Sequence, residues 1–194
     1  MAATNIEVWQ QGEIIEITQA ANDIKKIVIR QSNPAKADPG SHIDLMVKAN
    51  GEMVRRSYSV VSQSEDLRDI TLGVFLVPNS RGGSIAVHEL NVGDQLDITQ
   101  PLQNFPLRVG AERYVLIAGG IGVTAIMAMA AVLKRIGANY TLLYASRSRE
   151  AMAFREELQE IHGDNLQLYF DEDKNFIQIP ELIASLRSEE RRVG

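Results

Sequence analysis

The chain has 194 residues, of which 45% are hydrophobic and 23% charged. A chain of this length buries roughly 70% of its unfolded surface, so a metal or disulfide is not needed to stabilise it. The net charge of −5 removes the broad attraction to phosphate backbones, so no nucleic-acid partner is expected. Because cysteine is absent, these residues cannot form disulfides, cysteine-ligated zinc sites or iron–sulfur clusters. The sequence contains no membrane span and no signal peptide, which predicts a cytoplasmic protein without a membrane partner.

The first half of the chain has the pattern of short strands separated by turns. Segments rich in β-branched residues predict six strands, over 8–18, 25–31, 43–47, 56–61, 70–77 and 95–99. One helix-like stretch, from Ser84 to Leu90, interrupts them, and Ser84 is expected to cap it. Six short strands without a sustained helical period predict an antiparallel Greek-key β-barrel.

From Tyr114 the pattern changes to alternating strands and helices. The continuous apolar run 114–118 predicts a strand buried on both faces of a parallel sheet, and 140–144 and 166–170 predict two more strands. Helices are expected over 124–136, from Ser148 through Ile161, and over 179–186. This order predicts a partial Rossmann-like domain, because a complete doubly wound sheet normally has five or six parallel strands.

These patterns divide the chain into three parts. Residues 1–105 are expected to form the barrel and residues 112–186 the partial α/β domain, with a linker over 101–112. Residues 187–194 resemble the translation of a sequencing adapter, which predicts a non-native tail. A genuine charged end of the last helix is the alternative.

The three histidines fall in different predicted elements. Neither a metal site nor a Ser-His-Asp site is therefore expected from His42, His88 and His162. Surface or capping roles are predicted for all three.

Two stretches of the barrel half together favour a phosphate site. In an extended strand Arg56 and Tyr58 project to the same side, where a guanidinium can bind a phosphate and a phenol can lie against a planar ring. Gly82 and Gly83 let backbone N–H groups approach an anion at the start of the predicted helix. Either stretch alone fits an ordinary strand or turn, but their joint occurrence favours a phosphorylated aromatic cofactor.

A glycine-rich turn follows the first strand of the second half. Gly120, Gly122 and Ala125 match the G-x-G-x-x-A pattern that brings a pyrophosphate close to a helix N-terminus. The acidic ribose ligand expected about 20 residues later is missing. Instead the second strand ends in Ser-Arg-Ser-Arg over 146–149, where an arginine either meets a 2′-phosphate or borders the adenine. The acidic run 171–173 is another candidate ribose neighbour, and a turn that serves only packing is the alternative reading of the glycines.

In this order the motifs resemble the ferredoxin-reductase flavoprotein superfamily, above all its phthalate dioxygenase reductase and vanillate demethylase reductase branch. The resemblance rests on Arg56-x-Tyr58-Ser59, on Ser-Arg-Gly-Gly-Ser over 80–84 and on the glycine turn 119–124, and it covers residues 7–186. It implies an FMN-binding barrel, an NADH-binding domain and, beyond this sequence, a plant-type [2Fe–2S] domain. The implied activity is that of the electron-transfer reductase component of a Rieske-type oxygenase or demethylase. Such a reductase passes a hydride from NADH to FMN and then single electrons to an iron–sulfur acceptor.

The resemblance also implies roles for the motif residues. Arg56, Ser84 and the N–H groups around residues 81–83 would bind the FMN phosphate, and Tyr58 would pack along the ribityl chain and ring. Ser59, near the flavin N5 edge, and Thr124, at the nicotinamide–flavin junction, are the expected catalytic residues. The expected cofactor-binding residues are Arg56, Ser57, Tyr58, Ser59, Gly73, Val74, Phe75, Ser80, Arg81, Gly82, Gly83, Ser84, Gly119, Gly120, Gly122, Thr124, Ser146 and Arg147.

Several alternatives stay open from the sequence. FAD could replace FMN, and NADPH could replace NADH, as in a ferredoxin–NAD(P) reductase relative. The lack of an obvious adenine-binding segment in the barrel half favours FMN. Ala125 stands where the family usually has proline, and the family's later Cys-Gly-Pro strand is missing. A flavin-binding module without turnover is therefore the second hypothesis.

Overall fold

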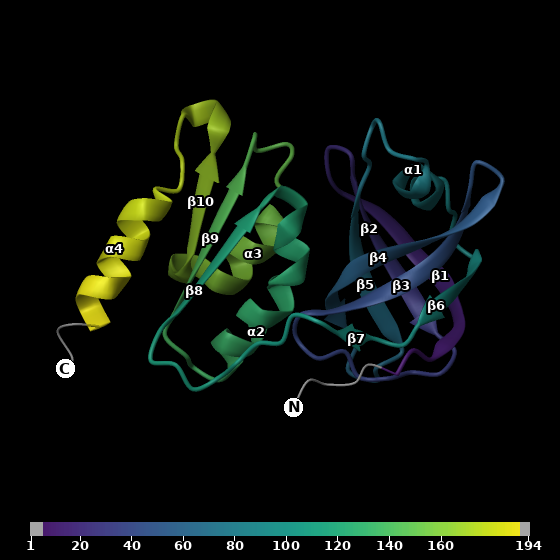
Figure 1. Ribbon diagram of the computed structural model, residues 1–194, viewed down its shortest axis with the longest axis horizontal. Coiled ribbons are helices and arrows are strands. Elements are labelled where there is room, and N and C mark those ends of the chain that lie inside the picture. The colour runs from purple at the N-terminus through teal and green to yellow at the C-terminus, as the bar shows by residue number, and fades with distance from the viewer. Residues whose placement is uncertain (1–5, 191–194) are drawn as a thin grey trace.

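The computed structural model describes residues 6–190, with side chains as far as residue 184. Figure 1 shows two lobes side by side, a barrel built by the first half of the chain and a smaller sheet lobe built by the second half. Within the described part of the chain, no helix combines the length and the apolar character that a membrane span requires.

The barrel is a closed antiparallel sheet of six strands. These strands are β1 (Trp9–Ala21), β2 (Ile24–Gln31), β3 (Ser41–Ala49), β4 (Glu52–Gln63), β5 (Asp69–Phe75) and β6 (Gln95–Thr99). Their order is β4-β5-β2-β1-β6-β3, and a further pairing of β3 with β4 closes the ring. The predicted barrel is confirmed. The expected linker contains a short strand, β7 (Leu102–Gln103), which the sequence did not predict. This strand pairs with β3.

Side chains along β3 point alternately into the barrel and away from it, and the inward ones form part of the barrel core. Ile43, Leu45 and Val47 are buried in the core with residues of the same kind from the other strands. Helix α1 (Gly83–His88) packs against β3, β4 and β5. His88, its last residue, forms a 2.8 Å contact between Nε2 and the carbonyl oxygen of Val74.

The other face of β3 carries a buried carboxylate. Asp44 is 1% exposed and accepts hydrogen bonds from the Ser57 hydroxyl and the Arg55 guanidinium of β4. Arg55 also binds Glu7 at 2.7 Å and lies over the Trp9 ring. Burial opposes ionisation of Asp44, but the hydrogen bonds from Ser57 and Arg55 outweigh it, so its pKa lies below the ordinary value. This network fixes β4 to β3 next to Arg56 and Tyr58.

The sheet lobe contains three parallel strands, β8 (Tyr114–Gly119), β9 (Tyr140–Ser146) and β10 (Leu166–Phe170), in the order β10-β9-β8. This confirms the partial parallel sheet. The helices are α2 (Met127–Arg135), α3 (Arg155–His162) and α4 (Ile179–Glu190), and the short 3₁₀ turns are η1 (Gly120–Ala125), η2 (Gly163–Asn165) and η3 (Asp171–Asp173). In Figure 1 α2 and α3 lie between the sheet and the barrel, and α4 lies beyond β10.

One hydrophobic core joins the lobes. Ile24 and Val61 of the barrel belong to the same buried cluster as Val123 and Met127 of the sheet lobe. The backbone N–H of Asn22, in the β1–β2 turn, also donates to the carbonyl oxygen of Glu150 at 2.8 Å. The barrel therefore holds the sheet lobe in a defined position.

The structure corrects several expectations for the sheet lobe. Strand β8 is not buried on both faces, because Ile117 is 44% exposed; the strand also lies at the edge of the described sheet. The predicted helix over 124–136 begins only at Met127, since η1 occupies the preceding turn. Helix α3 begins at Arg155 rather than near Ser148, because Phe154 adopts a left-handed φ of 57° that ends any helix before it.

Two further expectations concern His162 and the end of the chain. His162 is buried rather than superficial, and its Nδ1 lies 2.7 Å from the Tyr140 hydroxyl. Helix α4 continues to Glu190, past its predicted end at Leu186, and so includes part of the expected tail over 187–194. Residues 191–194 of that tail lie outside the described residues.

Candidate functional site

Arg56 of β4 lies directly over the glycine corner at the start of α1. A Cβ atom built on Gly83 would fall 1.9 Å from Arg56 Nε and 2.5 Å from its Cζ, so a side chain here would displace the Arg56 guanidinium from its position against the corner. Gly82, just before it, has a φ of 89°, which also favours glycine. The two predicted phosphate-binding segments, 56–59 and 80–84, therefore meet in space.

Hydroxyl groups brace the loop that carries this corner. The Ser80 hydroxyl accepts from the Gly82 N–H at 3.2 Å, and the Ser84 hydroxyl donates to it at 3.3 Å. Ser84 also accepts from the Val77 N–H at 3.1 Å, whereas Gly82 occupies the cap position that was expected for Ser84. The Asn50 amide donates to the carbonyl oxygen of Arg81 at 3.3 Å. Side chains of the loop itself and of Asn50 thus fix the shape of the corner, in which Gly83 and Ser84 are buried.

The predicted residues of β4 divide between its two faces. Register pairs Arg56 with Leu45 and Tyr58 with Ile43, while Ser57 and Ser59 alternate with them on the opposite face. Tyr58 is half-buried, and burial raises the pKa of its hydroxyl despite the nearby charge of Arg56. Arg56 and Tyr58 thus form one surface. Ser57 is not part of it, because its hydroxyl is bound to Asp44.

Strand β5 brings the barrel against the glycine turn of the sheet lobe. A Cβ on Gly73 would lie 2.7 Å from the Thr124 methyl and 3.0 Å from the Phe154 ring, so the absence of a side chain lets η1 approach. Thr124 is buried, and its hydroxyl donates to the carbonyl oxygen of Ile121 at 2.8 Å. Val74 is fully buried in the barrel core and its carbonyl oxygen contacts His88 Nε2, so the structure does not place this predicted site residue where a ligand could reach it.

The carboxyl ends of β8 and β9 open into a cleft between the lobes, here called the interlobe cleft. Its volume is about 610 Å³. Its lining residues are Asn22, Asp23, Ile24, Phe75, Gly119, Gly120, Ile121, Ala145, Ser146, Arg147, Ser148, Ala151 and Asp171. A Cβ added at Gly119, Gly120 or Gly122 would meet no atom within 4 Å, so the glycine turn borders open space. The cleft thus unites Gly119, Gly120, Ser146 and Arg147, all predicted to bind the pyridine nucleotide, with Phe75, predicted to border the flavin.

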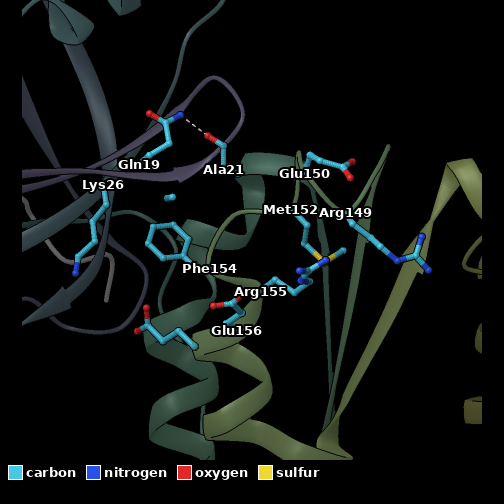
Figure 2. Close-up of a pocket in the computed structure, with 11 residues that line it drawn as sticks. Gln19, Ala21, Lys26, Arg149, Glu150, Met152, Phe154, Arg155 and Glu156 are labelled. Carbon is cyan, nitrogen blue, oxygen red and sulfur yellow. Dashed lines mark hydrogen bonds between the residues drawn. The ribbon is translucent and has the colours of Figure 1, made fainter.

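A second hollow, of about 390 Å³, lies between β1–β2 and the start of α3. Figure 2 shows Gln19 and Lys26 on its barrel side and Met152, Phe154, Arg155 and Glu156 on the other. Its lining contains three cationic and three carboxylate side chains, namely Lys26, Arg149, Arg155, Glu150, Glu156 and Glu157. This balance selects neither an anion nor a cation, and none of the predicted site residues lines the hollow. The interlobe cleft is therefore the better candidate for a nucleotide.

Sequence reasoning missed several residues around the site. Phe154 packs against Gly73 at the contact between the lobes, and Asn22 and Asp23 of the β1–β2 turn line the cleft. No motif marks these residues, because only the packing of the barrel against the sheet lobe brings them there.

Comparison with known proteins agrees with this geometry. Residues 11–106, which span the barrel, match the family model of the oxidoreductase FAD-binding domain. The chain belongs to the ferredoxin-reductase flavoprotein superfamily. A solved structure of this superfamily, phthalate dioxygenase reductase, superposes with a TM-score of 0.74 at 30% identity, covering 84% of this chain and 52% of that one. That protein transfers electrons from pyridine nucleotides to [2Fe–2S].

Several relatives are named as reductases. Tetrachlorobenzoquinone reductase from Sphingobium chlorophenolicum is 37% identical over 181 residues, which cover 88% of this chain and 55% of the relative. Vanillate O-demethylase oxidoreductase from Pseudomonas sp. strain HR199 is 38% identical over 152 residues, which cover 76% of this chain and 47% of the relative. The chain thus spans about half the length of these relatives.

Proposed function

We propose that this chain is the flavin and pyridine-nucleotide part of an NADH-dependent oxidoreductase that supplies electrons to a Rieske-type oxygenase or demethylase. The observation that carries the proposal is the packing of Arg56 over Gly83, next to a second lobe whose glycine turn contacts β5. One face of the barrel then offers a phosphate anchor, and the adjacent cleft offers space for a nucleotide.

The residues at the glycine corner fit the phosphate of a flavin. The Arg56 guanidinium would provide charge-assisted hydrogen bonds to the anion, and the missing Cβ of Gly83 lets this guanidinium lie against the start of α1. Tyr58, on the same face as Arg56, would lie along the ring, while Ser59, whose side chain lies on the opposite face of β4, would meet the N5 edge through its backbone. FMN is the expected flavin, with FAD as the alternative.

The interlobe cleft would take the pyridine nucleotide, with NADH expected and NADPH as the alternative. The pyrophosphate would lie against Gly119 and Gly120, where the backbone borders open space, and Ser146 and Arg147 would border the adenosine half. Thr124 would hold the turn against Gly73, so that the nicotinamide meets the flavin at the contact between the lobes.

A flavin held by Arg56 and the glycine corner would supply the chemistry of hydride acceptance from a reduced nicotinamide and of single-electron release. The contribution of this chain is to orient the two rings and exclude water between them. The electron acceptor would be an iron–sulfur centre in another domain or in the oxygenase component, since this sequence has no cysteine with which to ligate such a cluster. The cytoplasmic location also remains a prediction.

The test is the colour of the purified chain and its response to NADH. We expect bound flavin, seen in the visible absorbance bands, and loss of those bands when NADH is added without oxygen. Mass spectrometry of the released cofactor distinguishes FMN from FAD. A yellow chain that NADH does not bleach would be a binding module without turnover, and a chain that binds neither flavin would refute the proposal.

A further inference from the structure

One contact between the barrel and the sheet lobe lies at Gly73 of β5. A Cβ built on Gly73 would lie 2.7 Å from the Thr124 methyl and 3.0 and 3.2 Å from two atoms of the Phe154 ring. Thr124 and Phe154 are each 6% exposed, so the contact is closed to solvent. A side chain at Gly73 would have to push one of these groups away, and the lobes fit together here because β5 carries none.

Phe154 reaches this contact from an unusual backbone conformation. Its φ of 57° and ψ of 20° lie in the left-handed region, which a bulky side chain rarely adopts. Such a conformation persists only where the surrounding structure favours it. Figure 2 shows the ring directed toward the barrel residues Gln19 and Lys26, and the register of the sheet pairs Lys26 with Gly73. The burial of the ring between the lobes therefore accounts for the strained backbone.

The segment that ends at Phe154 touches the barrel at a second point. The Asn22 N–H donates to the carbonyl oxygen of Glu150 at 2.8 Å. Between the two points, Met152 and Ala153 are buried in the core that joins the lobes. Phe154 itself is not among the residues that line the interlobe cleft. It can therefore influence a nucleotide in the cleft only through the position of the sheet lobe.

We infer that Phe154 is a positioning residue for hydride transfer, because its ring, seated against Gly73, sets the sheet lobe on the barrel so that Thr124 stays beside β5. This inference rests on the proposed function, since it concerns how the two proposed binding sites are placed relative to each other. A displacement of about 1 Å between reacting groups can cost about 100-fold in rate. Loss of the ring should therefore slow hydride transfer while the affinities for FMN and for the ADP-ribose half of the nucleotide stay the same.

Distance measurements on the chain without any cofactor test the placement of the lobes. The sequence has no cysteine, so Glu65→Cys in the β4–β5 turn and Glu160→Cys in α3, both at exposed positions, would provide the only sites for nitroxide labels. Double electron–electron resonance should give one narrow distance distribution for this labelled chain. Adding Phe154→Ala should at least double its width, whereas Phe154→Tyr should keep it narrow. Phe170→Ala is the matched control, because Phe170 is buried in the same core but belongs to β10 at the edge of the sheet.

Gly73→Ala tests the same contact from the barrel side and removes no core side chain. The added Cβ would meet the Thr124 methyl and the Phe154 ring, so this variant should also broaden or shift the distance distribution. In Gly73→Ala combined with Phe154→Ala, the added Cβ should change the distribution less than it does when the ring is present. An equal change with and without the ring would assign the contact to Thr124 alone and overturn the role of Phe154.

Flavin reduction separates positioning from binding. In stopped-flow mixing with NADH, Phe154→Ala should lower the rate constant at saturating NADH about 10- to 100-fold. Fluorescence titration with FMN and calorimetric titration with ADP-ribose should give the affinities of the unmodified chain. An unchanged rate constant, an unchanged distance distribution in Phe154→Ala, or an equal broadening in Phe170→Ala would overturn the inference and leave the proposed function standing. A chain that binds no flavin would refute the proposed function, whereas the distance measurements would still decide how the lobes are held.

Discussion

The barrel and the sheet lobe bury their strands to different degrees. Every barrel strand from β1 to β6 has a neighbour on each side, and Ile43 and Leu45 are completely buried. In the sheet lobe β8 has one paired edge among the described strands, and its Ile117 is 44% exposed although it lies in a continuous apolar run. A run of apolar residues therefore predicts a strand reliably, but it does not show how many faces of that strand are covered.

The lobes also differ in how they build their part of the site. The barrel presents a braced corner in which Arg56 and Gly83 fit against each other with no space for a Cβ. The sheet lobe presents glycines that border open space and loops that are joined by ion pairs. We therefore expect substitutions in the barrel corner to change the affinity for a flavin, and substitutions in the glycine turn of the sheet lobe to change the affinity for a pyridine nucleotide.

The largest expected effect is a loss of stability at a covered face of the sheet lobe. Leu142 of β9 is completely buried, so Leu142→Ala should lower the free energy of unfolding by about 2–5 kcal/mol. Ile117→Ala, on the exposed face of β8, should cost about 1 kcal/mol at most. Chemical denaturation of both variants gives the two values. Equal costs would mean that the outer face of β8 is covered in solution.

A smaller effect is a difference in how the lobes respond to acid. Burial, and then the charge of Lys134, lower the pKa of His162 below its ordinary value of 6.5, so the unfolded chain takes up this proton first. The contribution of His162 to the free energy of unfolding is therefore complete above pH 6.5 and declines as the pH falls below 6.5. Asp44 has a lowered pKa, so its contribution to the barrel is lost only below its ordinary value of 3.8.

Amide hydrogen exchange of peptides from each lobe measures this difference. Between pH 6.5 and 4.5 protection should fall in the sheet lobe before it falls in the barrel. His162→Gln should reduce the change of amide protection with pH in the sheet lobe. His42→Gln, the matched change in β3, should leave that pH dependence as it is in the unmodified chain. A simultaneous loss in both lobes would contradict the assignment of the acid response to His162.

The sequence predicted the elements better than it predicted their surroundings. All six barrel strands and the three parallel strands could be located, because β-branched runs and turn residues act over a few neighbouring positions. The start of α3 could not, because it depends on Phe154 in a left-handed conformation packed against Gly73 of the other lobe. Short-range patterns contain no information about such a contact.

The same distinction applies to the site. Arg56, Gly83 and the glycine turn could be found because each belongs to a local motif with a chemical reason. The binding of Ser57 to Asp44, and of Arg149 to Glu172 and Asp173, depends on pairing between distant segments. Asp171 could only be given as one of several candidates, because its place in the cleft follows from the order of the strands.

The central claim is that Arg56 and the glycine corner hold one flavin phosphate together, and flavin affinity tests it most directly. Fluorescence titration with FMN should show binding weakened about 10- to 100-fold in Arg56→Ala, since a hydrogen bond to a charged group is lost. Gly83→Ala should weaken it similarly by displacing the Arg56 side chain without removing its charge. Arg30→Ala, which removes an equal charge from a surface ion pair with Asp69, should bind FMN as the unmodified chain does. Unchanged FMN affinity in Arg56→Ala and Gly83→Ala would contradict the claim.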